Sequence, residues 1–120
     1  MGHNFKELKV WNDSMAFAKE IFFITQTFPN EEKFGLISQM RKCTISILSN
    51  IAEGSGRTTD KEFARFLDIS LGSAYQIETQ ILLSYDFGYL IQEDKQKFIE
   101  LINSIQRMLI GLKNKISNHS

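Results

Sequence analysis

The chain of 120 residues is long enough to bury a single core and too short to divide in two, so we expect one domain over residues 1–120. A composition of 42% hydrophobic and 23% charged residues, with Pro29 as the single proline, is typical of a soluble globular protein with long helices. The 14 basic residues balance the 14 acidic ones, which excludes a global charge that would attract nucleic acid or an anionic membrane.

Apolar residues at helical spacing predict a first helix over residues 10–28. Pro29 ends that pattern, and Asn30 is expected to cap the N-terminus of a second helix over residues 31–53. The apolar arc of this second helix covers about half its circumference, wider than two neighbouring helices in a small bundle need. We therefore expect part of the arc, including Ile45, to lie outside the core of a single chain.

Gly54 follows the second pattern and is expected to end that helix. Thr59 stands three residues before Glu62, the spacing of a capping box, and predicts a third helix over residues 60–86. Gly88 ends the third helix. A fourth helix is expected over residues 93–116, which has the clearest apolar stripe of the four.

Four helices with short connections and no strand-like alternation predict an all-α fold, an antiparallel up-down-up-down four-helix bundle. The first residues carry charges and no unbroken apolar core, so we expect neither a signal peptide nor a membrane anchor. Cys43 is the single cysteine and cannot form an internal disulfide. The expected location is the cytoplasm.

Catalytic chemistry has few candidate residues in this chain. The two histidines, His3 and His119, lie at the ends of the chain, which argues against a hydrolase. No glutamate is followed three residues later by histidine, as a di-iron bundle requires, and Cys43 has no partner thiol. The Gly54–Arg57 segment could be a phosphate cradle, but without a preceding strand or a Walker lysine it is better explained as a helix connection. We expect no catalytic residue, no metal and no cofactor.

Polar side chains in apolar patterns form a second candidate set. Arg41 and Glu78 fall where a core is expected, and Asn50 and Glu53 lie on the second helix. A buried charge must be paired and hydrogen-bonded, so Arg41, Asn50, Glu53 and Glu78 are expected to form a structural polar network within the bundle or between subunits. A ligand pocket between helices is the less favoured alternative.

Four cations could form a local basic patch that binds RNA or DNA phosphates. They are Lys42, Arg57, Lys61 and Arg65. Because acidic residues are interspersed with them, a mixed solvated face is the alternative explanation.

The segment "SNIAEGSGR", followed by the pattern "FxxFLxxSxGS", is the most specific motif in the chain. With "FKELKVWNDSMAFAKEIF" at the start, it makes the chain resemble the bacterial four helix bundle protein family, whose founding members are encoded in intervening sequences of 23S ribosomal RNA genes. The resemblance implies an antiparallel bundle, a homopentameric ring and no established biochemical activity. The accessory protein of diversity-generating retroelements looks similar in fold and binds nucleic acid through a basic surface, a feature that this charge-balanced chain does not share globally.

A ring would give a use to the wide apolar arc and to apolar residues outside the core stripes, namely Ile69, Leu83, Phe87, Ile99 and Ile110. The leading hypothesis is therefore a non-enzymatic homo-oligomeric scaffold or accessory protein. The alternative is an accessory protein that binds RNA or DNA through the basic patch. No membrane partner and no small-molecule substrate are expected.

Overall fold

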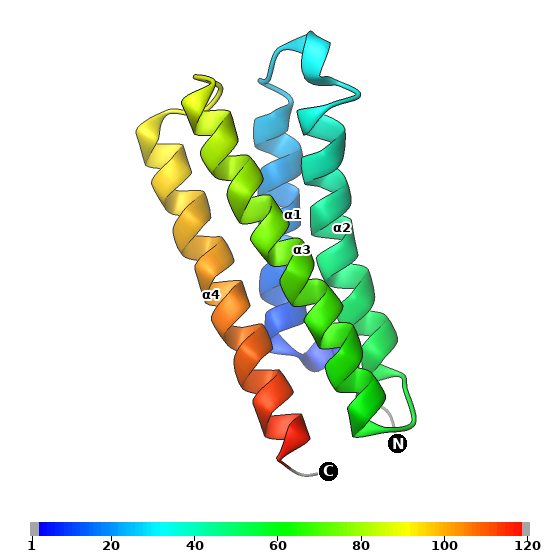
Figure 1. The fold of residues 1–120 in the computed structure, drawn as a ribbon. Helices are drawn as coiled ribbons and strands as arrows, with labels where there is room; N and C mark the ends of the chain where they lie inside the picture. Colours follow the sequence, from blue (N-terminus) through cyan, green and yellow to red (C-terminus); the bar gives the residue numbers. More distant parts are fainter. Residues whose placement is uncertain (1–2, 119–120) are drawn as a thin grey trace.

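Four α-helices make up the computed structural model, which describes residues 3–118 (Figure 1). The helices are α1 (Lys9–Thr25), α2 (Leu36–Ser55), α3 (Asp60–Asp86) and α4 (Gln92–Ser117), with two short 3-10 helices, η1 (Phe5–Glu7) and η2 (Asn30–Glu32). The part of the chain that the structure describes contains no strand. Successive helices run antiparallel, which confirms the predicted four-helix bundle.

Each helix packs against its neighbours in the sequence, and α4 also returns to pack against α1. The pairs α1 and α3, and α2 and α4, are therefore the diagonals of the bundle. The molecule measures 46 × 23 × 20 Å. The α2–α3 turn lies at one end of the long axis, here called the turn end, and the other two connections lie at the opposite end, the loop end (Figure 1).

Side chains from all four helices fill the centre of the bundle. Removal of these apolar side chains from water is the main favourable contribution to folding. The largest fully buried ones are Phe17, Phe63, Ile21, Met40, Ile47, Ile51, Leu67, Ile77, Ile81, Ile102, Ile105 and Leu109.

The connection between α1 and α2 differs from the expected helix bounds. α1 ends at Thr25, before Pro29, and α2 begins only at Leu36 because residues 30–32 form η2. Asn30 therefore lies inside η2 and does not cap α2. Instead the Leu36 amide donates a hydrogen bond to Oε1 of Glu32 at 3.3 Å, so a glutamate from the preceding turn supplies the cap.

The ends of α3 follow the turn chemistry of the sequence. Thr59 Oγ1 accepts a hydrogen bond from the Glu62 amide at 3.2 Å, which is one half of the predicted capping box. The Glu62 carboxylate accepts from Arg65. At the other end Gly88 has a φ of 82°, and the amides of Gly88 and Tyr89 donate to Tyr85 and Ser84, each at 2.9 Å, as in a Schellman motif.

None of the described helices combines the length and the apolar character that crossing a membrane would require.

Candidate functional site

The C-terminal half of α2 forms a polar joint with α3. The Asn50 amide donates to the Ser46 carbonyl at 2.8 Å and to Ser46 Oγ at 3.2 Å. Ser46 Oγ in turn lies 2.8 Å from Ser73 Oγ on α3. Asn50 therefore holds a hydroxyl pair that joins the two helices, and its amide nitrogen is fully used there.

Gly54 lies inside α2, which continues to Ser55 with Gly56 as its C-cap, so the prediction that Gly54 ends the helix is wrong. A Cβ atom at Gly54 would lie 2.6 Å from Cβ of Phe66 and 3.0 Å from Cδ1 of Phe63. The glycine is needed because the backbones of α2 and α3 approach closely at this point.

Two arginines flank one aromatic ring where the chain turns from α2 into α3. The guanidinium carbons of Arg57 and Arg65 lie 4.7 and 4.6 Å from the centre of the Phe66 ring. Each also has a carboxylate partner at 3.2 Å, Glu53 for Arg57 and Glu62 for Arg65. The Arg65 guanidinium, by hydrogen bond and charge, lowers the pKa of Glu62. We call these five residues the turn cluster. Its two positive and two negative charges cancel locally, and its contacts stabilise the connection between α2 and α3.

The basic patch expected from the sequence is not a single surface. Arg57, Lys61 and Arg65 lie together at the turn end, whereas Lys42 is 13 residues before Ser55, the last residue of α2, roughly 20 Å along the helix axis at 1.5 Å per residue. Lys42 and Lys61 are both exposed. Within residues 3–118 neither lysine has an ion-pair partner.

Arg41 crosses from α2 to the end of α1. Its Nε donates to Thr25 Oγ1 at 3.0 Å, and its Nη2 donates to the Phe22 carbonyl at 3.1 Å. The guanidinium carbon also lies 4.9 Å from the centre of the Phe22 ring. Arg41 therefore satisfies a carbonyl in the last turn of α1, where a cation is favoured by the helix dipole.

Glu78 faces the opposite side of the bundle. Its Oε1 accepts from Gln106 Nε2 on α4 at 2.7 Å, and the same nitrogen lies 3.3 Å from the Ala74 carbonyl. Arg41 is bonded to α1 and Glu78 to α4, so the two do not pair within one chain. The four residues expected to form one polar network thus have separate partners within the chain. Arg41 bonds to α1, Glu78 bonds to α4, Asn50 holds the Ser46–Ser73 pair, and Glu53 pairs with Arg57 in the turn cluster.

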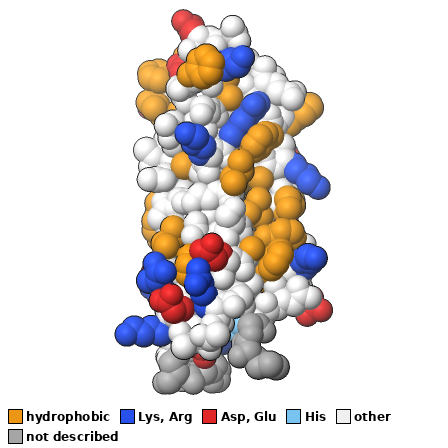
Figure 2. All heavy atoms as spheres, turned by 90° about the vertical axis from the view of Figure 1, so that its right-hand side faces the viewer, with side chains coloured by type: hydrophobic (Ala, Val, Ile, Leu, Met, Phe, Trp, Pro, Cys, Tyr) orange, Lys and Arg blue, Asp and Glu red, His pale blue; other side chains and the backbone are white. Residues whose placement is uncertain are grey.

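A groove of about 490 Å³ follows the outer seam between α1 and α2. Its lining is almost entirely apolar, and Lys19 and Gln26 are its polar members. Figure 2 shows hydrophobic side chains gathered along one flank of this side of the molecule, with the mixed charges of the turn end below. The apolar lining consists of Met15, Ala18, Phe22, Phe23, Ile45 and Leu48.

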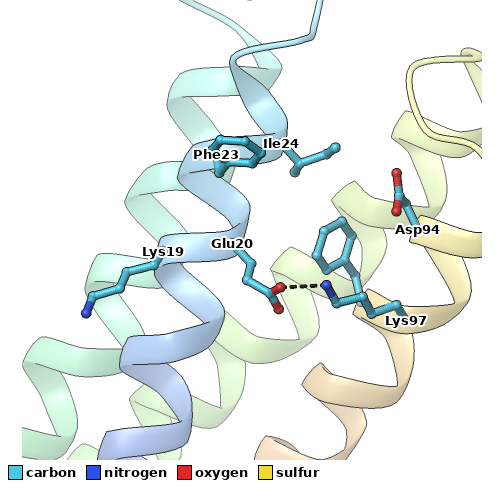
Figure 3. Close-up of a pocket in the computed structure, with 7 residues that line it drawn as sticks. Lys19, Glu20, Phe23, Ile24, Asp94 and Lys97 are labelled. Carbon is cyan, nitrogen blue, oxygen red and sulfur yellow. Dashed lines mark hydrogen bonds and ion pairs between the residues drawn. The ribbon is translucent and has the colours of Figure 1, made fainter.

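A second groove of about 470 Å³ opens between α1 and α4 near the loop end (Figure 3). Lys97 spans it and donates to Glu20 Oε1 at 2.6 Å, while Lys19 points away from this pair. The Glu20 carboxylate, by hydrogen bond and charge, raises the pKa of Lys97. The Lys97–Glu20 ion pair joins α4 to α1 across this groove.

The remaining catalytic candidates have structural surroundings. The His3 ring lies 5.1 Å from the ring of Phe63, and His119 is outside the described residues. The Cys43 thiol is buried, and burial raises its pKa, which disfavours the reactive thiolate. In residues 3–118, no group of three or more His, Cys, Asp and Glu side chains could hold a metal ion.

Sequence reasoning missed several exposed apolar side chains. Leu82 belongs to the apolar pattern of the third helix, yet this residue is 42% exposed. Tyr75, on the same helix, is 48% exposed. Ile99 was expected outside the core but is partly buried against it. The width of the apolar stripe on α3 was the available signal, because a helix with two packed neighbours leaves the edges of a wide stripe uncovered.

Known structures show the same fold. The chain is similar to a protein of unknown function from the S23 ribosomal protein family of Bacteroides thetaiotaomicron VPI-5482, whose crystal structure was determined at 1.70 Å resolution. The TM-score is 0.81 at 25% sequence identity, and the match covers 88% of this chain and 95% of that one. No match is found among curated proteins. The model of the 23S rRNA-intervening sequence protein family matches residues 6–111, nearly the whole of the described bundle, and the chain belongs to this family.

Proposed function

We propose that this protein is a non-enzymatic homo-oligomeric scaffold or accessory protein of the cytoplasm. The observation that carries the proposal is the apolar surface left uncovered on a single chain, above all the α1–α2 groove, where Ile45 is 51% exposed. Contiguous apolar surface of this kind marks an interaction site on a soluble protein. The grooves have largely apolar walls, and the one ion pair among the described residues that line them, Lys97–Glu20, joins two helices, which suits association better than chemistry.

Five copies is the assembly size that we propose, since a pentameric ring is what the resemblance to the four helix bundle proteins implies. The test is the mass in solution, measured by light scattering after size exclusion at micromolar concentration and near-physiological salt. We expect a single species near five times the chain mass of 13.9 kDa. A different multiple would change the ring size, and a monodisperse monomer would contradict the proposal.

A second candidate function is binding of RNA or DNA at the turn end. Arg57, Lys61 and Arg65 gather there within two helical turns, and Lys61 has no ion-pair partner among residues 3–118. The neighbouring carboxylates weaken this candidate because they already neutralise both arginines. Assembly into a ring would favour this candidate, because it would repeat the turn-end cations in every copy and multiply the number of phosphate contacts.

Fluorescence anisotropy with a labelled ribosomal RNA hairpin and a matched DNA duplex tests this second function. The K61E/R65E variant should lose affinity, and the salt dependence of binding should become shallower. The K42E variant is the matched control, since Lys42 lies at a distance from the turn end and should contribute little. Equal binding by K61E/R65E and the unmodified protein would eliminate the turn end as the site.

A further inference from the structure

Two apolar faces lie on different sides of the bundle. The α1–α2 face consists of Met15, Phe22, Ile45 and Leu48. The α3–α4 face consists of Tyr75 and Leu82 on α3 with Ile99 and Ile110 on α4. Because α1 and α3 are diagonal, as are α2 and α4, these two faces point in opposite directions.

Each face has a charged side chain beside its apolar residues, toward the loop end, and these two charges are opposite. Arg41 lies over the Phe22 ring, one helical turn from Ile45. Glu78 lies between Tyr75 and Leu82, three and four residues away on the same side of α3. The α1–α2 groove carries a second cation, Lys19, and the α3–α4 seam carries the Lys113–Asp68 ion pair, whose charges cancel. Among the residues that the structure describes, no acidic side chain lines the α1–α2 groove. The faces are thus complementary in charge as well as alike in apolar character.

Both charged groups retain an unused atom that can reach a partner. Arg41 uses Nε and Nη2 within the chain, and Glu78 uses Oε1. Among residues 3–118, Nη1 of Arg41 and Oε2 of Glu78 have no hydrogen-bond partner. Both side chains are only partly buried, so these atoms are available to another molecule.

The two charges also lie at the same height along the bundle. Met40 Sδ and Ser84 Oγ are 3.5 Å apart, and so are Cys43 Sγ and Gln76 Oε1. These contacts place residues 40–43 of α2 beside residues 76–84 of α3. Copies arranged side by side with parallel axes would therefore bring Arg41 of one to the level of Glu78 of the next.

We propose that the α1–α2 face of one copy binds the α3–α4 face of a second copy, with an ion pair between Arg41 Nη1 and Glu78 Oε2. This inference rests on the self-association proposed above and names the surfaces that form it. In the same parallel arrangement, contact of either face with itself would bring two arginines or two glutamates together, which costs affinity. A contact between two different faces leaves one free face of each kind on every pair, so it continues into a ring or a filament.

The first test reverses the two charges separately and together. R41E and E78R should each weaken association by roughly tenfold or more, because each sets like charges face to face, and R41E/E78R should recover most of the loss. The two residues lie on opposite faces of one chain, so recovery in the double variant must come from a contact between chains. K42E is the matched control: it removes the neighbouring positive charge on α2, and association should not change.

The second test is a cross-link that does not depend on these charges. In a C43S background, a mixture of I45C and Y75C chains should form disulfide-linked dimers under oxidation, and neither variant should do so alone. Ile45 and Tyr75 are at matching heights, since Ser46 contacts Ser73. Circular dichroism of every variant checks the fold, because Arg41 also satisfies the end of α1.

The outcomes separate this inference from the proposed function. A monomeric unmodified protein would overturn both. An intact oligomer without charge recovery and without the I45C–Y75C cross-link would overturn the named interface and leave self-association standing. Efficient cross-linking of I45C to itself would show that two α1–α2 faces meet, which also overturns the inference.

Discussion

Gly54 sets the distance between α2 and α3. A methyl group there would overlap Cβ of Phe66 at 2.6 Å, and a Cβ atom is part of the helix framework and cannot rotate away. We expect Gly54→Ala to lower the free energy of unfolding by about 1–3 kcal/mol, the usual cost of overpacking, although alanine favours a helix more than glycine does. Urea denaturation followed by circular dichroism measures the change.

Gly72 provides the matched control for this residue. It lies within α3, and a Cβ atom there would have nothing within 4 Å. Gly72→Ala should therefore raise the free energy of unfolding by up to about 1 kcal/mol through helix propensity alone. If both substitutions stabilised the protein equally, close approach at Gly54 would not be the reason for that glycine.

At the scale of elements, one hydrogen bond ties η2 to the segment that follows α3. The Tyr89 hydroxyl donates to Glu32 Oε2 at 2.9 Å, and this bond to the carboxylate raises the pKa of Tyr89. A raised pKa in the folded state means that the bond stabilises the fold below the ordinary tyrosine pKa of about 10 and is lost as the pH rises through the higher folded value. Glu32→Gln should bring the pKa of Tyr89 back toward its ordinary value.

Ultraviolet absorbance of tyrosinate during a pH titration measures this effect. The Y75F/Y85F background leaves Tyr89 as the only tyrosine, so the titration reports a single group. An unchanged midpoint in the Glu32→Gln variant would contradict the assignment of the hydrogen bond as the main cause. Urea denaturation of Tyr89→Phe checks the same bond: this variant should be less stable than the unmodified protein at neutral pH, and the difference should shrink as the pH rises through the folded pKa of Tyr89.

The sequence predicted the elements well where local chemistry decides them. Helical periodicity located all four helices, and Thr59 and Gly88 marked the ends of α3 because capping needs only nearby atoms. The start of α2 was misplaced although its Glu32 cap is nearly as local as the Thr59 cap, because the sequence pattern places residues 31 and 32 in the first turn of the helix, whereas they belong to the separate 3-10 helix before it. Gly54 was misjudged for a related reason: a helix-ending glycine and a close-packing glycine look the same in one sequence.

The candidate site was less predictable because its residues act across helices. Arg41 and Glu78 were identified as charges in apolar patterns, but their partners on α1 and α4 depend on which neighbour each helix side meets. Lys42 was grouped with Arg57 because both are cations, although most of α2 lies between them. Periodicity gives the side of a helix that a residue occupies, and only the arrangement of helices says what lies opposite.

At the scale of the whole molecule, the four helices differ in how extensively they pack against their neighbours. α3 packs extensively against both α2 and α4, whereas α1 has its looser seam with α4 and an open groove on either side. Local opening requires breaking only the contacts of the element that opens, so α1 should open at a lower free energy than α3. Arg41 and the Lys97–Glu20 pair are the polar ties that oppose this opening.

Hydrogen exchange measured by mass spectrometry tests this ranking. At low protein concentration, amides of α1 should exchange faster than the central amides of α3, which lie beside the fully buried Leu67, Ile77 and Ile81. Raising the concentration should slow exchange in α1, because α1 forms half of the α1–α2 face and association adds contacts that a single chain lacks. Equal protection of α1 and α3 at all concentrations would show that the grooves beside α1 do not weaken it, and that association does not use this face.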